Sequence, residues 1–231
     1  MPRIGIVAAL SFEARTLSPR KPVPGRPTPV APGLDLVWSG MDPRAVERAA
    51  ESLAGHGCGL LLGWGVAGAL RPGVRRGDLV LPGTIIGADG RRHTPHATFA
   101  ESFGALLPAT LRRHGGPIAE ARSPVGSPSE KRALGGRTGA AAVDMESAII
   151  ARVAARRGIR FHAVRVIIDE VGTALPSFVA EGGGPRRWLP APLRRPADLP
   201  RLVPLVRGYL CARRSLRTAA TALRQGSGRF T

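Results

Sequence analysis

Residues 143–169, VDMESAIIARVAARRGIRFHAVRVIID, contain the clearest structural signal in the chain. Apolar residues recur at helical spacing over residues 145–157, with Asp144 placed to cap the start of the helix and Gly158 placed to end it. The β-branched apolar run that follows predicts a buried strand ending on Asp169. A helix that leads into a buried strand is typical of a layered α/β domain.

The same alternation extends outward along the chain. We predict buried strands over residues 4–9, 34–38, 59–63 and 78–82, and helices over residues 43–55, 102–114 and 202–223. Residues 16–32 are rich in Pro and Arg, which favours a surface loop, and the Gly-, Pro- and Arg-rich residues 176–200 favour a loop or lid. The pattern predicts an α/β fold, a three-layer sandwich in which helices flank a central mixed β-sheet.

The charge of the chain is strongly positive. Lys and Arg total 34 against 16 Asp and Glu, and only Lys21 and Lys131 are lysines, so the net charge of +18 is almost all arginine. Two explanations of this positive charge are equally good. One is arginine-rich codon usage, and the other is an anionic partner, either a membrane surface or a phosphate-bearing substrate. We expect no nucleic-acid partner, because zinc-finger spacing and basic–aromatic interleaving are both missing from the sequence.

The cysteines and the N-terminus indicate the compartment. Cys58 and Cys211 are the only cysteines and neither forms a CxxC pair, so we expect no metal site, no disulfide framework and a cytoplasmic protein. The apolar run at residues 4–9 is too short to span a membrane, and we interpret it as the first buried strand.

Residues 63–68, GWGVAG, satisfy the GxGxxG pattern directly after a predicted strand. A dinucleotide site requires a helix to open at the third glycine, and Pro72 and Gly73 disfavour a helix here. We therefore interpret the motif as a glycine-rich loop between strands. Its backbone N–H groups could approach an anion or a sugar, and a tight loop without a ligand is the alternative.

Three acids follow the ends of predicted strands: Glu13, Glu146 and Asp169. Ligands of open α/β sheets bind beyond the carboxyl ends of the strands, so these side chains are candidates for one site. Each acid also has an ordinary structural explanation, as an exposed helix residue, a partner of a helix dipole or a turn cap. Together they suit N-glycosidic cleavage, in which an acid protonates the departing base and a carboxylate offsets positive charge on the ribose.

Four sequence blocks then resemble the purine nucleoside phosphorylase and methylthioadenosine/S-adenosylhomocysteine nucleosidase superfamily over about residues 3–172. The blocks are the first strand leading to Glu13, the turn Ser39-Gly40-Met41, GVAGAL followed by GDLV, and VDME followed by VRVIID. The resemblance implies a catalytic domain over residues 1–175, with residues 176–231 forming a Pro-, Gly- and Arg-rich segment and a basic C-terminal helix packed on the same domain. It also implies a homo-oligomer.

The resemblance implies roles for individual residues. Asp169 would be the general acid at the purine, Met145 and Glu146 would bind ribose, and Glu13 would orient the attacking water. The nucleophile site would be lined by Gly65, Val66, Ala67 and Gly68, and the base site by Val125, Gly126, Ser127 and Asp169. Arg15 is a candidate phosphate ligand from its charge. The sequence departs from the family at Val66, where many members have Ser or Thr, at Ile168, and in lacking a stacking aromatic near Val125.

One branch of the family is especially similar, the phosphorylase-like proteins associated with hopanoid biosynthesis. SGMDP, DEVGTALP and WLPAPLRRPADLPRLVPLVR support this resemblance. It implies phosphorolysis of adenosylhopane to adenine and ribosylhopane phosphate, with inorganic phosphate as co-substrate and no other cofactor. The alternatives are hydrolysis of the same bond and a non-enzymatic purine or lipid binder. The basic C-terminal helix is either a packed helix with solvated arginines or a peripheral contact with an anionic membrane.

Overall fold

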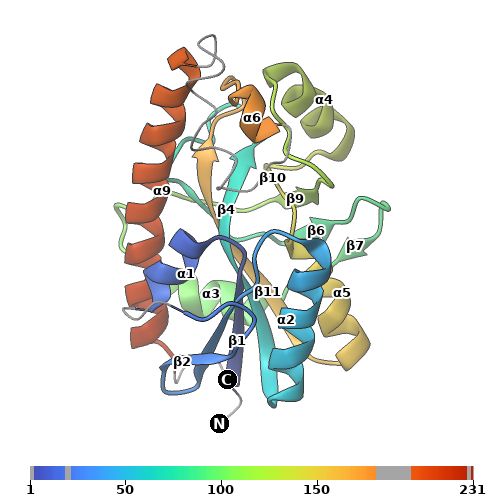
Figure 1. Ribbon diagram of the computed structural model, residues 1–231, viewed down its shortest axis with the longest axis vertical. Coiled ribbons are helices and arrows are strands. Elements are labelled where there is room, and N and C mark those ends of the chain that lie inside the picture. The colour runs from blue at the N-terminus through green and yellow to red at the C-terminus, as the bar shows by residue number, and fades with distance from the viewer. Residues whose placement is uncertain (1–2, 19–21, 181–198, 228–229, 231) are drawn as a thin grey trace.

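The computed structural model describes residues 3–18, 22–180, 199–227 and 230. Its centre is an eleven-stranded mixed β-sheet with helices on both faces (Figure 1). The strands are β1 (Arg3–Ala8), β2 (Thr28–Ala31), β3 (Leu34–Trp38), β4 (Cys58–Ala69), β5 (Leu79–Val80), β6 (Thr84–Ile86), β7 (Arg92–His93), β8 (Arg113–His114), β9 (Pro117–Glu120), β10 (Ala142–Asp144) and β11 (Arg160–Asp169). The helices are α1 (Ser11–Leu17), α2 (Pro43–Gly55), α3 (Ala97–Leu106), α4 (Pro128–Thr138), α5 (Ser147–Arg157), α6 (Ser177–Ala180) and α9 (Leu199–Gln225).

The sheet forks along β4, its longest strand. The first half of β4 pairs in parallel with β1 on one edge and with β11 on the other. Pairing with β1 ends at Gly63, and pairing with the antiparallel β10 begins at Gly68. Between these points, residues 64–67 keep β11 on one edge and have no strand on the other among the described residues. Backbone N–H groups of β4 are therefore free to bond side chains at the fork.

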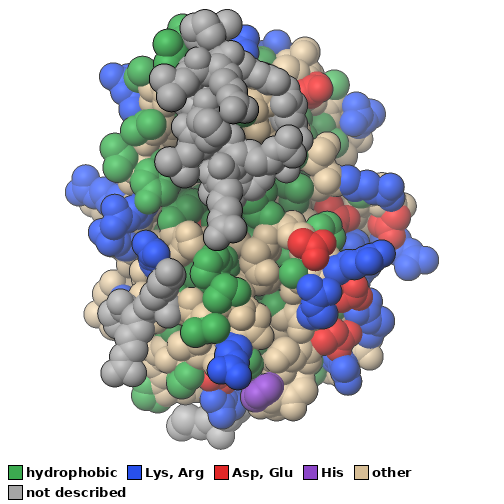
Figure 2. Space-filling view, viewed as in Figure 1, with side chains coloured by type: hydrophobic (Ala, Val, Ile, Leu, Met, Phe, Trp, Pro, Cys, Tyr) green, Lys and Arg blue, Asp and Glu red, His purple; other side chains and the backbone are tan. Residues whose placement is uncertain are grey.

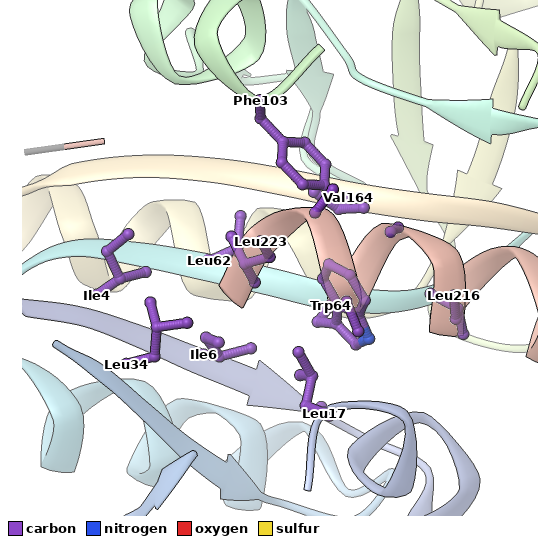
Figure 3. Close-up of a cluster of buried hydrophobic side chains, with 14 of the residues drawn as sticks. Ile4, Ile6, Leu17, Leu34, Leu62, Trp64, Phe103, Val164, Leu216 and Leu223 are labelled. Atoms are coloured by element: carbon purple, nitrogen blue, oxygen red, sulfur yellow. The ribbon is translucent and has the colours of Figure 1, made fainter. Parts of the chain in front are cut away.

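Apolar cores on the two faces of the sheet hold the layers together. On one face, Leu62, Trp64 and Val164 pack against Phe103 of α3 and Leu216 of α9 (Figure 3). On the other face, the buried residues of α2 and α5 pack against the sheet. Each face thus buries the apolar stripe of its helices, and the predicted class, helices flanking a central mixed sheet, is confirmed.

Several elements match their predictions closely. β3 and α2 have the predicted bounds, and the Asp42 carboxylate caps α2 by accepting the N–H of Arg44 at 3.3 Å. β11 ends on Asp169 as predicted, and Gly158 ends α5 with a φ of 64°. The start of α5 is two residues later than predicted, at Ser147, because residues 145 and 146 lie between β10 and the helix.

Other local predictions are wrong. The glycine-rich residues 63–68 are not a loop, because β4 continues through them to Ala69 and pairs with β11 along the way. The helix predicted over residues 102–114 is α3, which ends at Leu106 before Pro108, and the rest of that range includes β8. The loop predicted over residues 16–32 contains β2, an edge strand paired with β3.

α9 begins earlier than predicted and packs along β11 and α1. Gly208 is required at the closest approach, because a Cβ atom there would lie 1.9 Å from the carbonyl oxygen of Ile168. Most of the predicted lid, residues 181–198, lies outside the described residues. No helix in the described part of the chain has the length and apolar character needed to cross a membrane.

Candidate active site

A cavity opens at the fork in the sheet, where β4, β10 and β11 approach their C-terminal ends. Acids from three separate elements line it: Glu13 from α1, Glu146 from the start of α5 and Asp169 from the end of β11. The other predicted site residues in the wall of the cavity are Val66, Ala67, Gly68, Val125 and Met145. Residues separated by more than 150 positions in sequence therefore meet in one place, as the C-terminal edge of an α/β sheet allows.

Glu13 is held by backbone groups on both of its oxygens. Oε1 accepts the N–H of Val66 at 2.9 Å, in the unpaired stretch of β4, and Oε2 accepts the N–H of Leu10 at 2.8 Å. Burial raises the pKa of Glu13 to about 7, against the lowering effect of the Leu10 hydrogen bond and the Arg165 charge. A carboxyl with such a pKa can gain or lose a proton near neutral pH.

Arg165 is the buried cation that the acids share. It lies on β11 with 2% of its side chain exposed, and its Nε bonds Asp144 Oδ2 at 2.5 Å. Its Nη2 lies 3.6 Å from Glu146 Oε2 and has no hydrogen-bond partner within the described residues. Burial opposes the charge of Arg165, but the carboxylates of Asp144, Glu146 and Glu13 outweigh burial and raise its pKa. Arg165 thus offsets the repulsion between acids that the cavity brings together.

Glu146 occupies the N-cap position of α5 and faces the cavity. Burial raises its pKa above the usual range, and the neighbouring Asp144 and Glu13 charges add to the effect while Arg165 opposes it. Asp144 is fixed separately, because its carboxylate also accepts hydrogen bonds from the backbone N–H and the hydroxyl of Ser147. Both acids of the VDME motif therefore line the cavity, and Asp144 in addition supports the site through its bonds to Arg165 and Ser147.

Asp169 is buried and forms an ion pair with Lys131, whose side chain is 1% exposed. The Lys131 ammonium donates to Asp169 Oδ2 and also to the carbonyl oxygens of Glu170 at 3.2 Å and Thr173 at 2.8 Å. Burial raises the pKa of Asp169, and the Lys131 charge partly offsets that rise. The acid at the end of β11 is therefore a paired group rather than an isolated carboxyl.

The middle glycine of the GxGxxG motif, Gly65, makes room for these charges. A Cβ at Gly65 would lie 2.5 Å from Glu13 Oε1 and 3.0 Å from Arg165 Nη1. A Cβ at Gly68 would lie 3.4 Å from both carboxyl oxygens of Asp169, which is ordinary contact, and a Cβ at Gly63 would first meet the side chain of Ile150. Since no helix opens at the motif, Gly65 serves close approach of side chains to β4 and not a dinucleotide.

Four predicted residues do not line the cavity. Gly65 lies behind Glu13, and Ser127 caps α4 by accepting the N–H of Glu130. The Gly126 carbonyl accepts the N–H of Leu175, and Arg15 is an exposed residue on α1. The predicted base-site residues around Val125 lie in a loop, residues 123–127, of which Ser123, Pro124 and Val125 line the cavity.

The sequence interpretation missed α4, Lys131 and the role of Arg165. The signal for α4 was Ser127-Pro128 followed by Glu130, a capping box in which Ser127 and Glu130 each accept the other's backbone N–H. Lys131 was noticeable only as one of two lysines in an arginine-rich chain. Burial of a cation cannot be recognised from one sequence, because its partners come from distant segments.

The chain belongs to the phosphorylase superfamily, whose family model matches residues 3–181. This match confirms the superfamily resemblance seen in the sequence, while the hopanoid branch stays a prediction. The comparison with curated protein sequences found no match.

Solved structures share the fold at low sequence identity. A methylthioadenosine/S-adenosylhomocysteine nucleosidase from Neisseria meningitidis, in complex with methylthio-immucillin-A, has a TM-score of 0.73 and 16% identity over 97% of this chain and 100% of that one. The corresponding Helicobacter pylori nucleosidase has a TM-score of 0.70 and 18% identity, with 97% of each chain covered. Futalosine hydrolase of Helicobacter pylori has a TM-score of 0.70 and 18% identity over 96% of each chain.

Proposed function

We propose that the chain is an enzyme that cleaves the N-glycosidic bond of an adenine nucleoside. The observation that supports this most strongly is the convergence of Glu13, Glu146 and Asp169 on one cavity. Bond cleavage puts positive charge on the ribose and negative charge on the departing base, and carboxyl groups can serve both. The similarity to nucleosidases solved with methylthioadenosine analogues supports adenine as the base.

The position of each acid suggests its role in this proposal. Asp169, with a raised pKa at the end of β11, donates a proton to the purine so that the base leaves neutral. Glu146 accepts hydrogen bonds from ribose hydroxyls, and Met145 beside it packs on the sugar. Val125, which Gly126 and Ser127 follow in the chain, also lines the cavity and contributes to the base site.

Water is the nucleophile that the geometry of Glu13 supports. Its two backbone hydrogen bonds fix the carboxyl against β4, and a pKa of about 7 lets it accept a proton from water at neutral pH. The charged residues that line the cavity within the described part of the chain are all acids: Glu13, Asp144, Glu146 and Asp169. These acids suit a neutral nucleophile.

Phosphate is the second candidate nucleophile, and membership of the phosphorylase superfamily supports it. With phosphate as co-substrate, the predicted reaction is adenosylhopane and phosphate giving adenine and ribosylhopane phosphate. Apolar residues at the cavity, including Leu10, Met41 and Leu175, support a large apolar 5′ substituent.

The outer face of α9 supports a lipid-linked substrate and a peripheral membrane contact as part of the proposal. A stripe of apolar side chains at helical spacing is 50–55% exposed: Leu199, Val203, Val206 and Leu210. α9 contains no acid and six arginines, namely Arg201, Arg207, Arg213, Arg214, Arg217 and Arg224. Hydrophobic and basic side chains lie together over this helix in Figure 2, whereas acids and bases mix on the α2–α5 side. An anionic lipid surface complements the α9 face.

Adenine release tests the reaction and its nucleophile together. Adenosines with methylthio and progressively longer alkyl 5′ substituents are incubated with the full chain in buffer with and without phosphate, and adenine and sugar products are separated. Release of adenine and free sugar without phosphate supports water, and release that requires phosphate and yields a sugar 1-phosphate supports phosphorolysis. Failure to release adenine from any member in either buffer would contradict the proposed function.

Vesicle flotation tests the membrane contact separately. We expect the chain to float with anionic vesicles and less with zwitterionic ones, and Val203→Glu/Leu210→Glu to float less with the anionic vesicles. Equal flotation of the wild type and this variant would remove α9 as the contact.

A further inference from the structure

We propose that Lys131 is a positioning residue that directs the acid proton of Asp169 to one oxygen and stabilises the carboxylate left after proton transfer. The inference rests on the proposed function, in which Asp169 protonates the base. Lys131 does not line the cavity, so it acts through Asp169 and not on the substrate.

The geometry of the Lys131 ammonium group fixes how it contacts Asp169. A lysine ammonium has three donors and no acceptor. Lys131 directs its Nζ at three acceptors: Asp169 Oδ2 and the carbonyl oxygens of Glu170 and Thr173. The segment after β11 therefore wraps around the ammonium, which is fully buried and cannot rotate toward solvent.

The Lys131 contact determines which oxygen of Asp169 can carry a proton. A proton on Oδ2 would face the N–H donors of Lys131, which cannot accept it. Oδ1 has no hydrogen-bond partner within the described residues, and the Asp169 side chain lies in the cavity wall. The ion pair thus leaves Oδ1 as the oxygen that bears the proton and meets the base.

Lys131 also affects the site after the proton has left Asp169. The O–H bond of Asp169 breaks as its proton moves to a purine nitrogen, and the N-glycosidic electron pair stays with the base, which departs neutral. The resulting carboxylate is already paired with Lys131, so its formation in a buried site is stabilised. A lone buried carboxyl would hold its proton too tightly.

Other charges near Asp169 do not replace Lys131. Arg76, before β5, also lowers the pKa of Asp169, but its Nε is paired with Glu170 Oε1 at 3.2 Å. On the cavity side, the other charged residues of the wall within the described part of the chain are acids: Glu13, Asp144 and Glu146. Lys131 is therefore the cation in direct contact with Asp169 within the described residues.

The position of Lys131 is built into the fold. Ser127 and Glu130 cap the start of α4 reciprocally, and the backbone N–H of Lys131 bonds the Ser127 carbonyl at 3.1 Å. The cap fixes the first turn of the helix, from which the Lys131 side chain reaches the end of β11.

The test compares Lys131→Met with Arg132→Met, its exposed neighbour on α4, which loses the same charge. We expect Lys131→Met to lower kcat about 10- to 100-fold, because the carboxylate formed is unpaired. We also expect the high-pH limb of kcat/KM to move up by about one unit or more, because loss of an opposite charge raises a carboxyl pKa. Arg132→Met should leave both quantities unchanged. The proposal would be overturned if Lys131→Met lowers kcat but leaves the high-pH limb of kcat/KM at the wild-type pH.

A double-mutant cycle and a carboxyl titration separate this proposal from the proposed function. In the Asp169→Asn background, Lys131→Met should cost less than threefold in rate; an undiminished cost would show that Lys131 does not act through Asp169. The double variant removes both buried charges and should fold even if Lys131→Met does not. Carbon-13 NMR titration of the Asp169 carboxyl group measures the same pKa shift without turnover. The Asp169 signal is assigned by its loss in Asp169→Asn. A chain that releases no adenine contradicts the proposed function, whereas an Asp169 pKa that is equal with and without Lys131 contradicts the role of Lys131.

Discussion

His162 and Arg165 are buried ionisable side chains on the same strand, β11, and their surroundings differ completely. His162 lies in the apolar core beside Phe99, with ring centroids 5.1 Å apart, and neither ring nitrogen has a hydrogen-bond partner among the described residues. Burial, followed by the nearby His96, lowers the pKa of His162 to about 3, so the ring is neutral. Arg165 keeps its charge because Asp144, Glu146 and Glu13 surround it.

This difference distinguishes an ionisable side chain that is buried only to pack the core from ionisable side chains that are buried at a candidate active site. One end of β11 tolerates a titratable ring only in its neutral form, within a cluster of aromatic side chains. The other end assembles opposite charges beside a cavity, an arrangement that costs desolvation energy and that stability alone does not require. Partners of opposite charge, and not burial by itself, mark the candidate active site.

The largest effect should come from removing the shared cation. Arg165→Met leaves the carboxylates of Asp144, Glu146 and Glu13 without their buried partner, so we expect a loss of about 3–5 kcal/mol in unfolding free energy. Adenine release should fall to background. Urea unfolding and the release assay measure the two effects, and a variant with wild-type stability would show that Arg165 does not hold the acids together.

Asp169→Asn should come next in size. The amide keeps the shape of the side chain but has no acidic proton, so kcat should fall by about 10²- to 10⁴-fold with nucleoside binding retained. Calorimetric binding of a non-cleavable adenine nucleoside analogue provides the control. Unchanged turnover would show that another group protonates the base.

Gly65→Ala should damage the site without changing any charged residue. The new Cβ would meet Glu13 Oε1 at 2.5 Å and Cδ at 2.8 Å and must displace that carboxyl. We expect kcat/KM to fall by about 100-fold. Gly63→Ala is the matched control, since its Cβ would first meet the flexible end of Ile150 at 3.2 Å. Equal effects of the two substitutions would argue that the position of Glu13 is unimportant.

The pH dependence of hydrolysis should report Glu13. With a pKa of about 7 in the free enzyme, Glu13 is protonated below that pH and cannot accept a proton from water. We expect kcat/KM to decline by about tenfold per pH unit below 7. This low-pH limb should disappear in Glu13→Gln; a limb that persists there would belong to another group.

The smallest effect should come from His162→Leu. An apolar side chain of similar volume removes two unsatisfied nitrogens, so unfolding free energy should change by less than about 1 kcal/mol and activity should be unaffected. The folded pKa of His162 lies below its unfolded value of about 6.5, so acid favours unfolding of the wild type as the pH falls toward 3. The variant should therefore gain relative stability over that range, and an advantage independent of pH would contradict a neutral buried ring.

The sequence predicts the parts of this molecule that depend on local periodicity. β3, α2 and the end of β11 are correct because alternation, caps and Gly158 act within a few residues. The three acids are predictable because strand ends are visible in the sequence. The glycine stretch, residues 63–68, is a strand and not the predicted loop, and Gly65 is required there because Glu13 and Arg165 approach β4 from distant segments. The pairing of Lys131 with Asp169 depends on the tertiary fold in the same way.

The central claim is that the charged end of β11 breaks the N-glycosidic bond while the apolar end only supports the fold. Single-turnover release of adenine from one cleavable 5′-substituted adenosine, measured side by side for wild type, Asp169→Asn and His162→Leu, tests it most directly. We expect a rate about 10²- to 10⁴-fold lower for Asp169→Asn and within about threefold of wild type for His162→Leu. Equal rates for all three proteins, or no adenine from the wild type, would contradict it.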